Sequence, residues 1–91
     1  REMIHTLKIK QPYFQAVIGG DKTFEIRFND RGYQKGDQII LEEIYEHNGL
    51  YTRQKARADI SYVTNFEQKN NWVVFGIKNV KLIDNILNRE G

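Results

Sequence analysis

The sequence predicts one small α+β domain, mainly β, in which a short helix packs across the opening of a curved sheet or barrel. Its 91 residues allow one hydrophobic core but not two. Several segments alternate apolar and polar residues with the two-residue period of a strand, and they follow one another at short spacing through turn-forming residues. We therefore treat residues 1–91 as a single domain with the element order β-α-β-β-β-β.

The first predicted strand covers residues 4–10. Apolar and polar side chains alternate along it, and His5 falls on the apolar face together with Leu7 and Ile9. A histidine on such a face is more often a hydrogen-bonded core residue than a metal ligand or a catalytic base. We therefore expect His5 to belong to the core.

A short helix is predicted to follow this strand. Pro12 suits the first turn of a helix, and a Gly-Gly pair at residues 19 and 20 can close it. Tyr13 lies near the helix start, where unpaired backbone N–H groups favour an anion, so it is a candidate either for ligand binding or for ordinary packing. The buried stripe has the i, i+3, i+4 spacing and comprises Phe14, Val17 and Ile18.

The strand predicted at residues 23–28 is the most informative part of the chain. Lys22 precedes it, and Glu25 and Arg27 share its polar face. These charges are either a solvated pair worth a few tenths of a kcal/mol, or a group able to bind an anionic or carbonyl oxygen. The pattern predicts a half-buried strand, whose apolar face comprises Phe24, Ile26 and Phe28.

Three further strands are predicted in the second half of the chain. Residues 38–46 are predicted to form a strand with some apolar residues on each face, which indicates partial burial on both sides. Asn48-Gly49 then signals a hairpin. A long strand begins at Tyr51, and residues 72–80 form a strongly apolar strand. The first half of the long strand is basic, which indicates either a solvated edge or a nucleic-acid surface. Its cations are Arg53, Lys55 and Arg57. The side chains of the apolar strand that we expect to face the core are Val73, Phe75 and Ile77.

The remaining segments are predicted to be loops and a tail. Residues 29–37 are dense in turn formers and should form an exposed loop. Residues 65–71 are polar, and Phe66 could anchor them. Residues 81–91 are expected to form a short helix around Leu82, Ile83, Ile86 and Leu87.

The composition argues against several classes of function. The chain has no cysteine, which removes disulfides and thiolate chemistry and suits a reducing cytoplasm. Two isolated histidines form no metal-binding motif, so we expect no metal or other cofactor. Ser61 is the only serine and lies in an apolar strand, so a serine triad is not indicated. No apolar run reaches the roughly 18 residues of a membrane helix, and we expect a cytoplasmic protein.

The charge and the aromatic content allow an anionic partner. Fourteen basic and twelve acidic residues leave a net charge of +2, which is far from the basic stripe of a strong duplex binder. Five tyrosines, five phenylalanines and one tryptophan are more aromatic side chains than a core of this size needs. The excess rings are candidates for stacking on bases.

Residues 20–27, Gly-Asp-Lys-Thr-Phe-Glu-Ile-Arg, match the pattern GxKxxExR. This pattern resembles the signature of the ASCH domains (activating signal cointegrator homology), small β-barrels of the PUA-like superfamily. The resemblance implies a cleft between helix and sheet for RNA or a nucleotide-like ligand, lined by Lys22, Glu25 and Arg27, with Gly20 allowing close backbone approach. An uncharacterised bacterial and phage branch of that superfamily is similar over most of the chain, including residues 5–9, 29–33, 36–37, 62–64 and 73–74.

The resemblance leaves open whether the domain is an enzyme. One group in the superfamily removes acyl groups from modified cytidine with a lysine, a threonine and a glutamate, and another cleaves RNA. This chain has Glu25 where the deacylating group has threonine, and Thr23 is out of register. The leading prediction is therefore RNA or nucleotide binding. One alternative is a small hydrolase of modified nucleosides or RNA, in which Lys22 stabilises an oxyanion and Glu25 handles the proton. Another is a protein-interaction module with an exposed strand edge.

Overall fold

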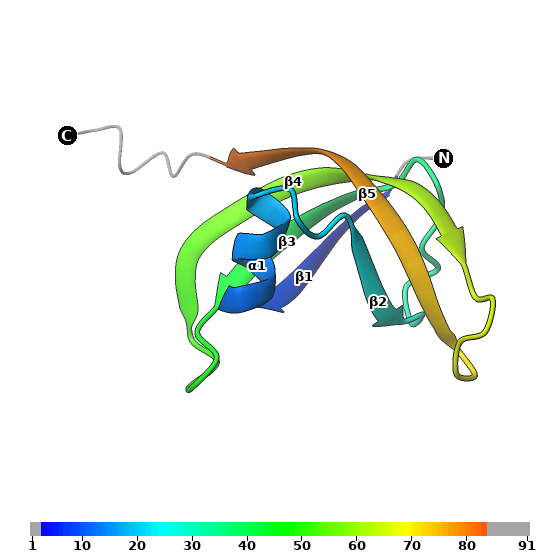
Figure 1. The fold of residues 1–91 in the computed structure, drawn as a ribbon, viewed down its shortest axis with the longest axis horizontal. Coiled ribbons are helices and arrows are strands. Elements are labelled where there is room, and N and C mark those ends of the chain that lie inside the picture. Colours follow the sequence, from blue (N-terminus) through cyan, green and yellow to red (C-terminus); the bar gives the residue numbers. More distant parts are fainter. Residues whose placement is uncertain (1–2, 84–91) are drawn as a thin grey trace.

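The computed structural model describes residues 3–83, which form one helix and five strands in the predicted order. Its elements are β1 (Ile4–Lys10), α1 (Gln11–Ile18), β2 (Phe24–Phe28), β3 (Gln38–Ile44), β4 (Tyr51–Thr64) and β5 (Trp72–Ile83). The strands form a single curled sheet of order β1-β3-β4-β5-β2 (Figure 1). β1 pairs with β3 in parallel, and the other neighbouring strands are antiparallel.

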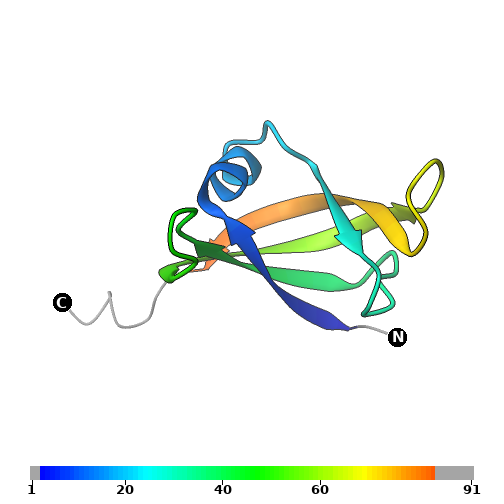
Figure 2. The same ribbon diagram turned by 90° about the horizontal axis from the view of Figure 1, so that it is seen from below.

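The sheet is a half-barrel whose two edges are β1 and β2. These edges face each other across an opening, and α1, which connects them along the chain, lies at one end of it (Figure 2). The prediction of a mainly β domain with one short helix is confirmed. In the part of the chain that the structure describes, no helix has the length and apolar character needed to cross a membrane.

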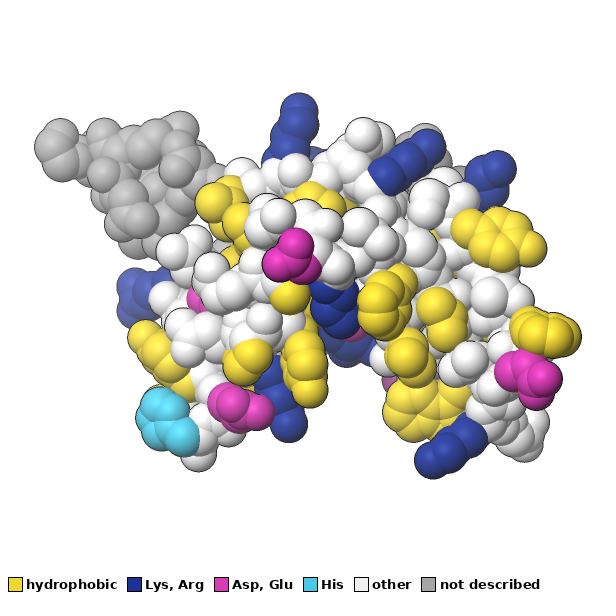
Figure 3. Space-filling view, viewed as in Figure 1, with side chains coloured by type: hydrophobic (Ala, Val, Ile, Leu, Met, Phe, Trp, Pro, Cys, Tyr) yellow, Lys and Arg dark blue, Asp and Glu magenta, His cyan; other side chains and the backbone are white. Residues whose placement is uncertain are grey.

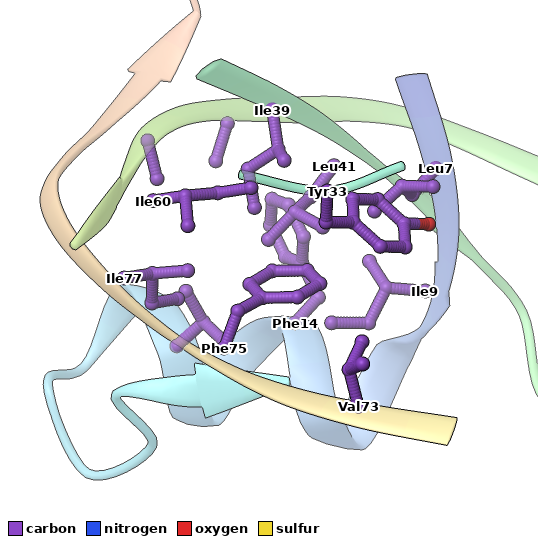
Figure 4. Close-up of a cluster of buried hydrophobic side chains, with 13 residues drawn as sticks. Leu7, Ile9, Phe14, Tyr33, Ile39, Leu41, Ile60, Val73, Phe75 and Ile77 are labelled. Carbon is purple, nitrogen blue, oxygen red and sulfur yellow. The ribbon is translucent and has the colours of Figure 1, made fainter. Parts of the chain in front are cut away.

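The hydrophobic core fills the concave side of the sheet, beneath α1 (Figure 4). The helix contributes Phe14 and Val17, as its apolar spacing predicts, and Phe75 of β5 is fully buried near the centre. Burial alternates along β1 and along the first half of β5, so the side chains predicted to face the core do so. The strand residues of the core are Leu7, Ile9, Ile39, Leu41, Ala56, Ala58, Ile60, Val73, Phe75 and Ile77.

The loop at residues 29–37 is less exposed than predicted, because two of its side chains are buried. The Tyr33 ring packs against Phe75, with ring centroids 4.8 Å apart. Asp37 is buried beside His5, and 2.8 Å separates its Oδ2 from the His5 Nε2. The expectation that His5 is a hydrogen-bonded core residue is confirmed. A carboxylate from the loop supplies the polar partner that the buried ring requires.

Two predictions about the C-terminal half are wrong. Residues 81–83 continue β5 and pair with β4, so they do not begin a helix, and the rest of the predicted tail helix lies outside the described residues. The reason is that β4 is 14 residues long and offers backbone partners along its whole length, which a short amphipathic pattern does not outweigh. Phe66 is exposed and does not anchor its loop in the core.

Candidate functional site

Strand β2 turns its charged face inward. Glu25 is only 4% exposed, whereas Phe24, Ile26 and Phe28 on the other face are 43%, 49% and 48% exposed. The strand is half buried as predicted, but the buried face is the charged one and not the apolar one, and the interpretation of Glu25 and Arg27 as a solvated pair is wrong. The pairing of β2 with β5 explains why the charged face of β2, and not its apolar face, points to the core.

The pairing register between β2 and β5 places Glu25 opposite Phe75. Residues that lie opposite each other in adjacent strands point to the same face of a sheet. Because Phe75 points into the core, Glu25 also points inward, and its neighbours along β2 must point outward.

The buried Glu25 carboxylate is held between two cations. Its Oε2 accepts a hydrogen bond from the Lys22 ammonium, and its Oε1 accepts one from the Arg27 Nε at 3.1 Å. Such charge-assisted hydrogen bonds offset the cost of removing the carboxylate from water. Glu25 therefore fixes the positions of the lysine and the guanidinium, and the three groups together carry one excess positive charge.

Two arginine side chains bridge the opening between the edge strands. Arg27 Nη2 donates to the Lys8 carbonyl at 2.8 Å, and Arg31 Nη1 donates to the Thr6 carbonyl at 3.1 Å. Thr6 and Lys8 are two residues apart on β1, so their carbonyls point to the same edge. The two guanidinium groups thus occupy the place where a neighbouring strand would donate hydrogen bonds to β1. They link this edge of the sheet to β2 and the loop that follows it.

A cleft of about 610 Å³ lies along this opening, between β1, β2 and the start of α1. Its volume falls within the range of about 300–1,000 Å³ that small-ligand sites occupy. Figure 3 shows it as a hollow with lysine and arginine side chains inside it. The cations among its lining residues are Lys8, Lys10, Arg27 and Arg31, and the aromatic residues are Tyr13, Phe28, Tyr33 and Trp72.

The structure brings Tyr13 together with the GxKxxExR motif. The Lys22 ammonium lies 5.5 Å from the centroid of the Tyr13 ring and 5.3 Å from that of Phe24, distances suited to cation–π contacts. Gly20 adopts a φ of +88° in the turn between α1 and β2, a conformation that L side chains rarely adopt. The roles of these residues in ligand binding stay predictions.

The basic segment of β4 lies on the outer side of the sheet and does not line the cleft. Lys55 and Arg57 alternate with the inward-facing Ala56 and Ala58. Lys55 pairs with Glu42, with 3.3 Å between Nζ and Oε2, and Arg57 donates a hydrogen bond to the Gln38 side chain. Arg53 is also exposed, and nucleic-acid binding by these cations stays a prediction for a surface separate from the cleft.

Sequence reasoning missed most of the charged and aromatic residues that line the cleft. Lys8 and Lys10 lie on the polar face of β1, and they could be found only if β1 were recognised as an edge strand facing β2. Arg31 and Tyr33 lie in the loop that follows β2 directly. Their closeness to the motif in the sequence was the available signal.

Tyr33 places a buried phenol against the cleft, and burial raises its pKa above the ordinary value of 10.0. The nearby positive charges of Arg31 and Arg27 oppose this shift without cancelling it. The hydroxyl is therefore protonated at neutral pH and able to donate a hydrogen bond.

We expect Tyr33 to ionise above its ordinary pKa of 10.0 in an ultraviolet absorbance titration of the folded protein. Above pH 10.0 the unfolded chain loses the Tyr33 proton while the folded chain keeps it, so the free energy of unfolding should fall as pH rises. Tyr33→Phe should remove the late ionisation and flatten this dependence. A titration curve that Tyr33→Phe leaves unchanged above pH 10.0 would contradict the expectation.

The cleft can hold a ligand that combines negative charge with a planar ring. Its cations can contact phosphate or carboxylate oxygens, and its rings can stack on a base. Within residues 3–83, no group of three His, Asp or Glu side chains is placed to hold a metal ion.

Comparison with known proteins gives a family match. Residues 4–77 match the sequence profile of a family described as "Domain of unknown function (DUF3850)". A protein of Escherichia phage P2, described as an uncharacterized 12.9 kDa protein in the GpA 3′ region, is 41% identical over 61 residues. The match covers 67% of this chain and 54% of the phage protein, so it spans about half of that relative. The family match includes every residue that lines the cleft.

Proposed function

This chain belongs to the DUF3850 family, and from that premise we propose that its cleft binds RNA or a nucleotide-like ligand. The observation that carries the proposal is the cleft between β1 and β2, where four cations and four aromatic residues line one space. The GxKxxExR motif contributes Glu25 and Arg27 to the lining of this cleft, and its Lys22 contacts Glu25. Its position supports assignment of the half-barrel to the ASCH branch of the PUA-like superfamily, which the motif resembles.

The cations of the cleft suit phosphate groups. Lys8 and Lys10 are exposed on β1, and the Arg31 side chain is 45% exposed. The ion pair of Arg31 with Asp30 is long, at 3.7 Å, and solvent-exposed, so it competes weakly with a bound phosphate. Arg27 is already oriented by Glu25 and by the Lys8 carbonyl, which reduces the entropy lost when it binds an anion.

The aromatic residues of the cleft suit nucleobases. Phe28 and Trp72 meet edge to face at its mouth, with ring centroids 6.0 Å apart, and Tyr13 is half exposed at the helix end. Bases that leave a stack can pack on such rings in single-stranded RNA or in free nucleotides. A cleft of about 610 Å³ suits a nucleotide or a short single-stranded segment, not a duplex.

The Glu25 geometry supports binding ahead of hydrolysis. A general base must turn a carboxylate oxygen toward the proton that it abstracts. Both Glu25 oxygens instead accept hydrogen bonds from Lys22 and Arg27. The carboxylate thus acts as an anchor for two cations, of which Arg27 lines the cleft.

The test is a titration of the protein with nucleosides, nucleotides and short single-stranded RNA and DNA in low salt. Trp72 is the only tryptophan and lines the cleft, so its fluorescence reports ligand binding there. We expect RNA or nucleotides to bind in a salt-sensitive way, because phosphate contacts release counterions.

Lys22→Ala should weaken this binding by at least about tenfold, because it removes one of the two cations that hold the Glu25 carboxylate, which lines the cleft. Lys35→Ala, which removes an exposed cation outside the cleft, should leave the affinity unchanged. Circular dichroism of both variants checks the fold. Equal affinity in wild type and Lys22→Ala, or no response to any of the ligands, would refute the proposal.

A further inference from the structure

The outer face of β2 continues across β5 to β4 as an apolar surface. This outer apolar surface comprises Phe24, Ile26, Phe28, Tyr62 and Trp72. Tyr62 is 65% exposed and Trp72 is 38% exposed. Figure 3 shows hydrophobic side chains gathered over β2 and β5, beside the hollow of the cleft.

Strand pairing makes this surface continuous. Phe24 and Tyr62 both pair with Gly76 of β5, one from each side. Phe28 pairs with Trp72, and their rings are in edge-to-face contact. Residues in one row across paired strands share a face, so the five side chains form one patch and not scattered contacts.

The outer apolar surface lacks the charges that a nucleic acid requires. None of its five side chains is charged. Arg27 is held on the other face by Glu25, and the Lys22 ammonium, which also contacts Glu25, lies at the edge of the surface, 5.3 Å from the centroid of the Phe24 ring. Depletion of charge with enrichment of aromatic residues is typical of the centre of a protein–protein interface. A protein is therefore a better occupant of this face than an RNA.

The size of the surface matches one half of a protein interface. At about 200 Å² for each large side chain, the exposed fractions of the five residues amount to roughly 500 Å² of apolar area. A standard interface buries about 800 Å² per partner, of which about 60% is apolar. An apolar patch of that size is at the upper end of what soluble monomers expose.

We propose that a second copy of this chain covers the outer apolar surface in a two-fold symmetric dimer. In such a dimer the same patch lies on both sides of the contact. A charged side chain near the two-fold axis would therefore lie close to the same charge of the partner and be repelled by it. A patch without charged side chains avoids that repulsion, and its area is sufficient for a stable dimer. Ile26, Phe28 and Trp72 also line the cleft, so each cleft opens beside the contact between the two chains.

The experiment is a measurement of the mass in solution, by sedimentation equilibrium and by light scattering after gel filtration, over a range of protein concentrations. We expect twice the chain mass of 10.8 kDa at high concentration. Tyr62→Glu should weaken the dimer by at least about tenfold, because it places a charge on each side of a desolvated contact. Tyr62 is well exposed and lies outside the cleft, so the variant should fold and keep its ligand affinity.

A matched control and a second variant complete the test. Leu50→Glu alters a side chain that is 62% exposed in the hairpin between β3 and β4, at the far end of the molecule, and should leave the dimer intact. Ile26→Glu should disrupt it as Tyr62→Glu does. A wild type that has the mass of one chain at every concentration would overturn the proposal, and so would a dimer that survives both variants. A monomeric wild type that loses RNA binding on Tyr62→Glu would assign the surface to nucleic acid instead.

Discussion

Arg27→Ala is expected to abolish ligand binding in the cleft and to lower the free energy of unfolding by about 2–4 kcal/mol. The Arg27 guanidinium holds the buried Glu25 carboxylate and ties β2 to the Lys8 carbonyl of β1. Its removal leaves Glu25 with Lys22 as its remaining cation and removes one of the two bridges across the opening. Urea denaturation measures the stability, and the Trp72 fluorescence titration measures the affinity.

Two further variants separate the charge of Arg27 from its geometry. Arg27→Lys keeps the charge but cannot reach Glu25 and Lys8 at once, so it should recover part of the stability and little of the affinity. Arg57→Ala removes an arginine from the outer side of the sheet and should not affect ligand binding in the cleft. If Arg27→Ala bound ligand as wild type does, Arg27 would not belong to the site.

Asp37→Ala is expected to lower the free energy of unfolding by about 3 kcal/mol. Asp37 Oδ2 accepts hydrogen bonds from the His5 ring and, at 3.2 Å, from the Gln34 backbone N–H. The variant would leave the buried His5 Nε2 without its hydrogen-bond partner, at the end of the core where β1 meets the loop.

A double-mutant cycle tests the pairing of His5 with Asp37. His5→Phe keeps a ring in the space beside Tyr33, where the two rings are 5.0 Å apart. The double variant His5→Phe/Asp37→Ala should lose less stability than the sum of the two single losses, because neither polar group is left buried alone. Losses that add without coupling would show that the contact contributes nothing of its own.

Local patterns were sufficient to predict which elements exist. The alternation in residues 4–10 and 72–80 predicted β1 and most of β5, and the apolar spacing before the Gly-Gly pair predicted α1. Asn48-Gly49 marked the hairpin between β3 and β4. These signals succeed because side-chain period and turn conformation depend on a few neighbouring residues.

The pattern of β2 was not sufficient to predict which of its faces is buried. A period of two assigns side chains to two faces but does not say which face meets the core. The three large apolar residues indicated that their own face is buried. The register, which places Glu25 opposite the buried Phe75, buries the charged face instead. The cost of burying Glu25 is met by Lys22 and Arg27, a compensation that cannot be recognised before their side chains are placed.

The sequence by itself determined the order of the elements and the motif residues Lys22, Glu25 and Arg27 as a group. Only the tertiary structure decided that β1 and β2 become the edges of a half-barrel, which brings Lys8 and Lys10 to that group and leaves the basic segment of β4 on the opposite side. It also decided that an aromatic face remains outside. The physical reason is that local conformation follows from neighbours in the chain, whereas a cleft follows from strand order and register, which join residues far apart in sequence.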